Sequence, residues 1–342
     1  MSVLAPQAPA EAPVEPMTGP PERRELTSVP GSGDRVFIGL MRLGAVGVVA
    51  VIAMVGLFLA VRAAQAISVA KFSFLTTQAW EPDIHHFGIL GVGVNTILIA
   101  LVAVVISLPV SLGLSLFISE IAPQRTKRLL VTMVDLMAAV PSVVYAIWGL
   151  EFLEGRSIGI SRFLSSWFGW VPFFHVTAPG GAGGGETTFT ASTFIVGMVV
   201  SLMVIPIQCS MMREGFSQAP IGEREGAYAL GSTRWGMIRS VVLPFGRAGI
   251  IGGTMLGLGR ALGETLAVYL IISPEFAINW HILQSGGHSI SALIALRASD
   301  ASPFETSALM AAGLALFLLT LGVNFIASAI VARSRSGADS DL

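Results

Sequence analysis

Charged side chains are scarce in this chain of 342 residues: only 12% are Asp, Glu, Lys or Arg, whereas 53% are hydrophobic. Soluble domains carry about 25% charged residues. The composition, with a mean hydropathy of +0.76, therefore excludes an ordinary soluble domain and indicates a polytopic membrane protein. The net charge of −1 indicates no partner, because in a membrane protein the distribution of charge matters more than its sum.

Cysteine and the common catalytic motifs are also missing. The single cysteine, Cys209, lies in an apolar run, which excludes a disulfide framework and a cysteine-based zinc site. No two of the five histidines have the H-x-x-x-H spacing, so we expect no metal site. The chain has no G-x-x-x-x-G-K-[ST] phosphate loop, so we expect no bound cofactor and no ATP hydrolysis by this chain alone. No nucleophile and base converge at one membrane depth, which disfavours a membrane enzyme.

Long apolar runs are what the sequence does have. About 20 such residues cross a bilayer, and six runs reach that length. Two contain a proline, Pro109 in the second and Pro141 in the third, and either proline is expected to kink its helix. The predicted spans are Leu43–Val61, Phe87–Ser119, Leu129–Leu150, Thr187–Met212, Ala248–Ser273 and Thr306–Ala332.

These runs predict an all-α membrane protein with six transmembrane helices. Residues 1–35, rich in Pro, Ala, Glu and Ser, are expected to be a disordered segment. Residues 36–62 would form the first transmembrane helix and residues 87–333 the core. Residues 334–342 would form a cytoplasmic tail.

The basic residues predict the orientation. With six spans and both termini inside, fourteen of the twenty Lys and Arg residues fall in cytoplasmic segments and five fall outside; the remaining one, Arg260, lies in the fifth span. Short loops rich in Lys and Arg stay in the cytoplasm, so both termini and the segment before Pro244 are predicted to be cytoplasmic. The aromatic segment ISRFLSSWFGWVPFFHV is then outside, either at the headgroup level or against an extracellular partner.

The stretch from Ile221 to Ser273 joins a polar segment to an apolar one. Its first half, IGEREGAYALGSTRWGMIRSVVLP, is rich in small residues that another protein can approach closely. Pro244 is expected to end this element, because proline cannot continue a helix without losing a hydrogen bond. From the residues alone, the segment is either a docking helix or an ordinary amphipathic interfacial helix.

This segment resembles a motif of the permease subunits of type I ABC importers, E-A-A-x3-G-x9-I-x-L-P. Gly226 replaces an alanine and Val241 replaces the isoleucine, while the spacing of Glu225, Gly231 and Pro244 is intact. In that family the segment is the coupling helix, which sits in a groove of a cytoplasmic ATPase. The resemblance implies a coupling helix at about residues 222–236, and it implies that the residues meeting the ATPase are Glu225, Gly226, Ala227, Leu230 and Gly231.

Four further segments are similar to the PstC-type permeases of phosphate-specific importers: FLTTQAWEP, DLMAAVPSVVYAIWGLEFL, IPIQCSMMREGF and GLGRALGETLAV. The resemblance covers roughly residues 70–333. It implies a second, PstA-like permease, a PstB-like ATPase dimer that holds ATP and magnesium, and an extracytoplasmic PstS-like phosphate-binding protein.

Two charged residues inside the fifth predicted span are candidates for the substrate pathway. An Arg at mid-bilayer costs about 2.5–3.5 kcal/mol on insertion scales, so Arg260 needs a partner or a wet cavity. Glu264 is four residues on and is predicted to share its helix face. The two either form a self-contained ion pair or line the pathway, where the Arg260 guanidinium suits phosphate oxygens. The carboxylate of Glu264 would accept a hydrogen bond from a protonated phosphate, which sulfate at neutral pH does not offer.

Glycine spacings along the same span suggest a second contact. Gly253, Gly257, Gly259 and Gly263 let helix backbones approach closely in lipid, and we expect them to face a partner permease. Three functional alternatives stay open at this point: a permease for another oxyanion such as sulfate or molybdate, the sister phosphate permease, and a stand-alone secondary transporter or channel.

Overall fold

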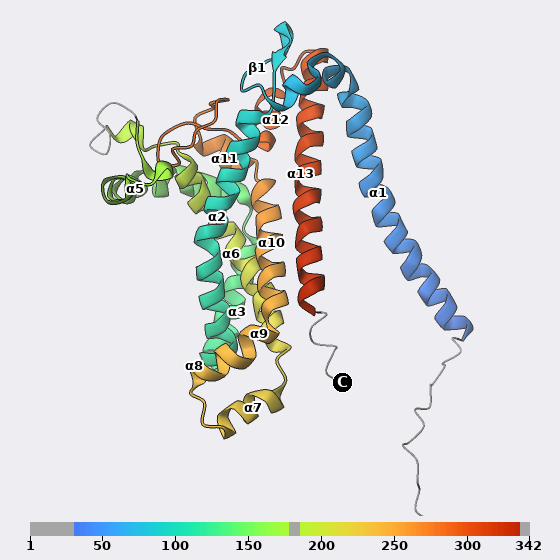
Figure 1. Cartoon of the computed structure of the whole chain (residues 1–342), viewed down its shortest axis with the longest axis vertical. Helices are drawn as coiled ribbons and strands as arrows, with labels where there is room; N and C mark the ends of the chain where they lie inside the picture. Colours follow the sequence, from blue (N-terminus) through green and yellow to red (C-terminus); the bar gives the residue numbers. More distant parts are fainter. Residues whose placement is uncertain (1–30, 178–184, 336–342) are drawn as a thin grey trace, which may run out of the picture. The chain divides into compact units, whose positions relative to one another are not determined.

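A computed structural model of the protein describes residues 31–177 and 185–335 (Figure 1). By internal contacts the chain forms two compact units, residues 1–53 and 54–342. Apart from Gly31, the described part of the first unit belongs to one helix, α1 (Ser32–Ala70). Most of the predicted disordered segment, residues 1–30, and most of the predicted tail, residues 336–342, lie outside the described residues. Residues 32–35 of that segment are helical.

The described part of the second unit is mainly helical and includes one small hairpin, in which Trp80 pairs with Phe87 and Glu81 with His86. After α1 the elements are η1 (Lys71–Leu75), β1 (Trp80–Glu81), η2 (Pro82–Ile84), β2 (His86–Phe87), α2 (Leu90–Leu116), η3 (Phe117–Ile121), α3 (Gln124–Ala139), α4 (Ser142–Trp148), η4 (Gly149–Leu153), α5 (Glu154–Phe168), η5 (Pro172–Phe174) and η7 (Glu186–Thr188). They continue with α6 (Thr193–Ser217), α7 (Ile221–Ala229), α8 (Arg234–Met237), η8 (Ile238–Val242), α9 (Leu243–Phe245), α10 (Arg247–Leu262), α11 (Leu266–Ile271), α12 (Ile290–Arg297) and α13 (Pro303–Arg335).

Four of the described helices are long and apolar enough to cross a membrane, and six spans result if each of two bent pairs counts as one. The four are Ser32–Leu75, Leu90–Ile121, Thr193–Ser217 and Pro303–Ile330. The bent pairs are Gln124–Ala139 with Ser142–Phe168, at 91°, and Arg234–Phe245 with Arg247–Leu262, at 65°. The predicted all-α membrane fold is confirmed.

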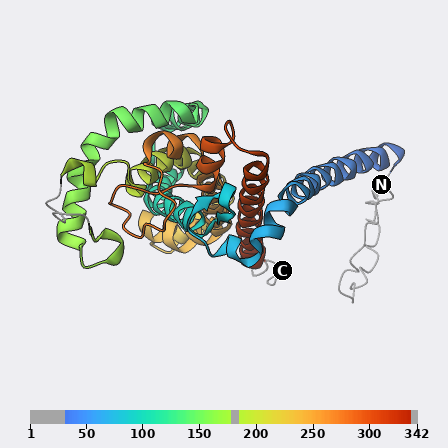
Figure 2. The ribbon, with the colours of Figure 1, turned by 90° about the horizontal axis from the view of Figure 1, so that it is seen from above.

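The third predicted span is broken rather than straight. Helix α3 ends before Val140, which is extended (ψ 127°), and Pro141 precedes α4. A residue before proline is disfavoured in the helical region, so Pro141 does more than kink this helix. Seen from above, α3–α5 (green) curve around one side of α2, α6 and α10 (Figure 2).

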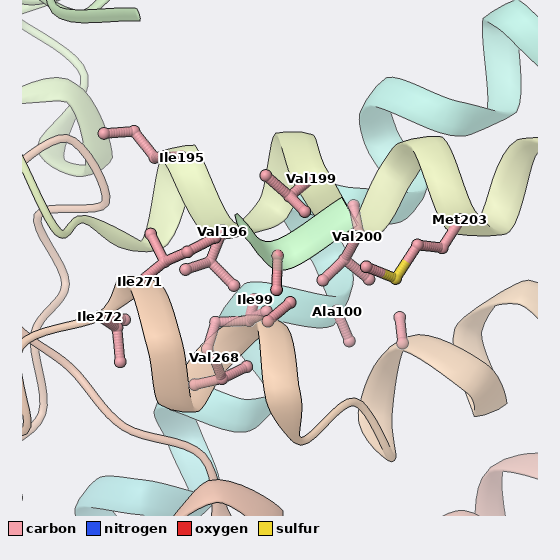
Figure 3. Close-up of a cluster of buried hydrophobic side chains, with 14 of the residues drawn as sticks. Ile99, Ala100, Ile195, Val196, Val199, Val200, Met203, Val268, Ile271 and Ile272 are labelled. Atoms are coloured by element: carbon pink, nitrogen blue, oxygen red, sulfur yellow. The ribbon is translucent and has the colours of Figure 1, made fainter. Parts of the chain in front are cut away.

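Helix α6 is the centre of the second unit and packs against both α2 and α10. Its Ile195, Val196, Val199 and Val200 meet side chains of α2 and α11 in a continuous apolar cluster (Figure 3). Helix α10 also packs against α13. Helices α7–α9 lie at one end of this group, whereas α11, α12 and the hairpin lie at the other (Figure 1). We call these the α7 end and the α12 end.

Helix α5 buries polar side chains and exposes apolar ones. Its buried residues include three serines one turn apart, Ser157, Ser161 and Ser165, whereas Phe163 and Trp167 are exposed. An outward apolar face with a polar face packed inside is what a helix surrounded by lipid requires. This pattern supports the predicted placement at the membrane and leaves the alternative of an extracellular partner open.

Candidate functional site

Helix α7 (Ile221–Ala229) is an exposed helix with no fully buried residue. Glu225 and Gly226 are exposed, and Ala227 is half-buried. Leu230, just past the helix end, is 89% exposed. The five residues predicted to meet an ATPase therefore lie together at the α7 end, and four of them are exposed.

Gly231 shapes the end of α7. Its φ is +83°, in the left-handed region that favours glycine. The Gly231 N–H donates to the carbonyl of Tyr228, and the Ser232 N–H donates to that of Ala227, at 2.9 and 3.0 Å. These two bonds form a Schellman motif, which satisfies the last carbonyls of the helix. The glycine of the motif is therefore required by the backbone and not by a lack of space, because nothing would lie within 4 Å of an added Cβ.

The element after this turn does not end at Pro244, contrary to the prediction. Helices α8, η8 and α9 run on to Phe245, and the 65° bend follows at Gly246. Pro244 has no N–H to donate one turn back, but the preceding turn, Ile238–Val242, has the wider π-helical bonding. Such a turn is a common way to accommodate an irregularity inside a helix.

The fifth predicted span is interrupted at its charged residues, which the sequence analysis did not predict. Helix α10 ends at Leu262, Gly263 follows, and α11 starts only at Leu266. Arg260 therefore lies in the last turn of α10, and Glu264 lies in the break beyond it. The two do not share a helix face, and the described residues show no ion pair within 4.0 Å between Arg260 and Glu264.

Glu264 is turned into the protein. Its side chain is 9% exposed, and its Oε1 accepts a hydrogen bond from the Ala267 N–H at 3.3 Å. This bond satisfies one of the first free N–H groups of α11, and a carboxylate there is stabilised by the helix dipole. The backbone carbonyl of Glu264 accepts from Ser291 Oγ, at the start of α12, at 2.6 Å.

Arg260 is exposed and lines a cavity of about 340 Å³ with Ile207, Leu256, Gly259 and Asn324. The cavity walls come from α6, α10 and α13, and Asn324 is the other polar side chain in it. A guanidinium within an apolar helix bundle is expected to face a polar or wet space. The cavity provides such a space, and of the two candidate residues Arg260 is the one open to a ligand.

Three of the expected glycines, all in α10, face helices of this chain, and the expected contact of this span with a partner permease stays a prediction. A Cβ added at Gly253 would lie 3.1 Å from the Gln208 carbonyl oxygen, and one at Gly257 would lie 2.6 Å from Val204 Cγ1. Both neighbours belong to α6. Gly259 instead faces Asn324 of α13, at 3.4 Å. Small residues here let α10 approach two helices of its own subunit.

Two further features of the structure have no signal in the sequence pattern. Arg224 of α7 donates to Glu120 Oε2 at 3.0 Å and to the Phe216 carbonyl at 2.7 Å. At the α12 end, His288 is 1% exposed, and neither ring nitrogen has a hydrogen-bond partner among the described residues. Burial, and to a lesser degree the charge of Arg297, lower the pKa of His288 from 6.5 to about 4.

The fold and the α7 segment define a class of protein, and comparison with known proteins agrees. The model of the binding-protein-dependent transport system inner membrane component family matches residues 111–336. The chain is similar in fold to a bacterial ABC transporter involved in the import of the acidic polysaccharide alginate. The TM-score is 0.54 at 17% identity, over 87% of this chain and 99% of that one.

Curated relatives are more similar in sequence. The chain is 38% identical over 310 residues to the phosphate transport system permease protein PstC 2 of Mycobacterium bovis, which covers 89% of this chain and 94% of that protein. It is 40% identical over 279 residues to PstC of Mycobacterium leprae, covering 80% and 85%. The chain belongs to the binding-protein-dependent transport system inner membrane components, and within them to the PstC-type permeases. It is thus a multi-pass component of the cell membrane and not itself the catalytic subunit.

Proposed function

We propose that this chain is a permease subunit of an ATP-driven importer of inorganic phosphate and forms part of the translocation pathway. The observation that carries the proposal is the similarity, over about nine-tenths of the chain, to a permease named for phosphate transport. The exposed guanidinium of Arg260 in its cavity supports an anionic substrate, because a planar fork of donors suits phosphate oxygens.

The partners follow from the same family. The permease would work with a second, PstA-like permease, a PstB-like ATPase dimer that holds ATP and magnesium, and an extracytoplasmic PstS-like phosphate-binding protein. The α7 end would face the cytoplasm, as the distribution of basic residues predicts. Exposed Glu225, Gly226, Leu230 and Gly231, with half-buried Ala227, would form the surface that meets the ATPase.

Arg260 and Glu264 would have different roles in transport. Arg260 is the residue we expect to contact phosphate. Glu264 holds the α10–α11 break through its bond to the Ala267 N–H. Only after movement of the break would its carboxylate reach a protonated phosphate oxygen, which would distinguish phosphate from sulfate. The mechanism is alternating access, in which closure of the ATPase displaces α7 and reorients the spans.

Competition for uptake tests the substrate. Cells that express the complete importer, and lack their own, should accumulate radiolabelled phosphate in an energy-dependent manner. Excess unlabelled phosphate should suppress this uptake, whereas equal concentrations of sulfate and molybdate should not. Equal suppression by sulfate would show a permease for another oxyanion. Uptake that persists without the ATPase subunits would instead show a secondary transporter or channel.

A further inference from the structure

Arg224 of α7 forms hydrogen bonds with residues at the ends of two membrane helices. Its Nη1 donates to Glu120 Oε2 at 3.0 Å, and its Nη2 donates to the Phe216 carbonyl at 2.7 Å. Glu120 lies in η3, which continues α2, and Phe216 is the second-last residue of α6. The guanidinium therefore joins the ends of α2 and α6 to the helix that lies beyond them.

Apart from the backbone connection through residues 218–220, few side-chain contacts attach α7 to these two helices. None of its residues is fully buried, and Ala227 is the α7 residue that packs against the apolar cluster at this end, around Met212 and Phe216 of α6 and Met237 of α8. A single alanine methyl offers little apolar surface. Arg224 is thus the main side-chain contact by which a displacement of α7 would reach α2 and α6.

The chemistry of the contact suits a rigid connection. The carboxylate of Glu120 is nearly buried, with 4% of its side chain exposed, and the side chain of Arg224 is 23% exposed. Removing one partner of a buried pair is unfavourable, because the other charge is left uncompensated. The Phe216 carbonyl is at the C-terminal end of α6, where the helix dipole favours a cation. The planar fork holds both acceptors in a fixed geometry, which a lysine ammonium cannot do.

We propose that Arg224 is the positioning residue that transmits displacement of α7 to α2 and α6, with Glu120 as its partner. This inference rests on the proposed coupling of α7 to an ATPase and names the residue through which that coupling acts. An importer without this contact would still bind its ATPase and hydrolyse ATP. It would move little substrate, because α7 would shift without the membrane helices.

The first test is the ratio of phosphate transported to ATP hydrolysed by the complete importer in proteoliposomes. Arg224→Gln and Glu120→Ala should keep the ATPase bound and hydrolysis within about twofold of the parent, whereas the ratio should fall at least about tenfold, as expected for loss of a charge-assisted bond. Arg224→Lys should give an intermediate ratio. Arg125→Gln is the matched control, since Arg125 is exposed and follows Glu120 closely in the sequence, and it should match the parent. Release of the ATPase by Arg224→Gln would overturn the proposal, because Arg224 would then serve binding.

A second measurement reports the connection itself and needs no substrate. Spin labels are placed at Glu223→Cys on α7 and Val110→Cys on α2, both exposed positions, with Cys209→Ala removing the native thiol. In the parent importer, the distance between the labels should stay constant when ATP binds; in Arg224→Gln it should change or broaden. A constant distance and a parental transport ratio in Arg224→Gln would overturn the inference. Absence of phosphate uptake in the parent would refute only the proposed substrate, because the label distance would still decide the role of Arg224.

Discussion

Ser291 Oγ donates a 2.6 Å hydrogen bond to the backbone carbonyl of Glu264, which joins the start of α12 to the break between α10 and α11. The Ser291 hydroxyl also contacts that of Ser289, at 3.1 Å, and Ser289 Oγ accepts from the Ala292 N–H. The break is therefore held from the α12 end by a polar network, while the Glu264 side chain caps α11.

Removing the Ser291 hydroxyl should loosen this break. Ser291→Ala leaves a buried carbonyl without its partner, and such a loss costs about 1–3 kcal/mol. We expect a lower midpoint of thermal unfolding in detergent, together with altered phosphate uptake. Ser166→Ala is the control, because Ser166 is exposed and bonds only within its own helix. Equal midpoints for the two variants would show that the network does not hold the break.

The two glycines at the α7 end should respond differently to alanine. Gly231→Ala places a side chain at φ +83°, which costs roughly 1–2 kcal/mol, and should weaken binding of the ATPase by distorting the turn. Gly226→Ala restores the residue of the family motif in open helix space. It should be neutral or stabilise α7 by up to about 1 kcal/mol. The affinity of the purified permease for the ATPase is measured for both variants. A larger loss from Gly226→Ala than from Gly231→Ala would contradict the account.

Close packing of α10 on α6 gives a third pair of variants. In Gly257→Ala the new methyl would lie 2.6 Å from Val204 Cγ1 and 2.7 Å from Gln208 Nε2, whereas Gly252→Ala meets nothing within 4 Å. Overpacking of this kind costs about 1–3 kcal/mol. Thermal unfolding should show a lower midpoint for Gly257→Ala alone. Similar midpoints would mean that the two helices are less tightly packed than the structure shows.

His288 predicts how stability depends on pH. Its pKa is about 4 in the folded protein and ordinarily 6.5, so between these values the unfolded chain binds more protons than the folded one. Stability should therefore rise with pH from about 4 to 6.5, by at most about 1.4 kcal/mol per pH unit from this group. This contribution of His288 to stability should be lost as the pH falls through that window. The unfolding midpoint is measured against pH across this window. The rise of the midpoint with pH should be smaller in His288→Gln than in the parent, and an unchanged rise would exclude His288 as its source.

The sequence predicts the helices and the α7 motif because both depend on local pattern. Runs of apolar residues reveal spans, and the spacing of Glu225, Gly231 and Pro244 reveals the motif. Pro141 also marks a local break, although the pattern predicts a kink rather than a full interruption. The break at Gly263–Thr265 depends instead on how several elements meet. Glu264 does not lie beside Arg260, because its side chain accepts a hydrogen bond from a backbone N–H of α11 and its carbonyl accepts one from Ser291. Ser291 is 27 residues further along the chain. The Arg224–Glu120 contact joins residues 104 apart, and no spacing rule reveals such a pair.

Uptake by the Arg260→Gln variant shows whether Arg260 contacts the substrate in the pathway. Arg247→Gln is the matched control, since Arg247 is exposed at the opposite end of α10. With assembly and ATPase binding verified, Arg260→Gln should lower phosphate uptake at least about tenfold, the effect of losing a charge-assisted bond to the anion, while Arg247→Gln transports normally. Normal phosphate uptake by Arg260→Gln would contradict the account.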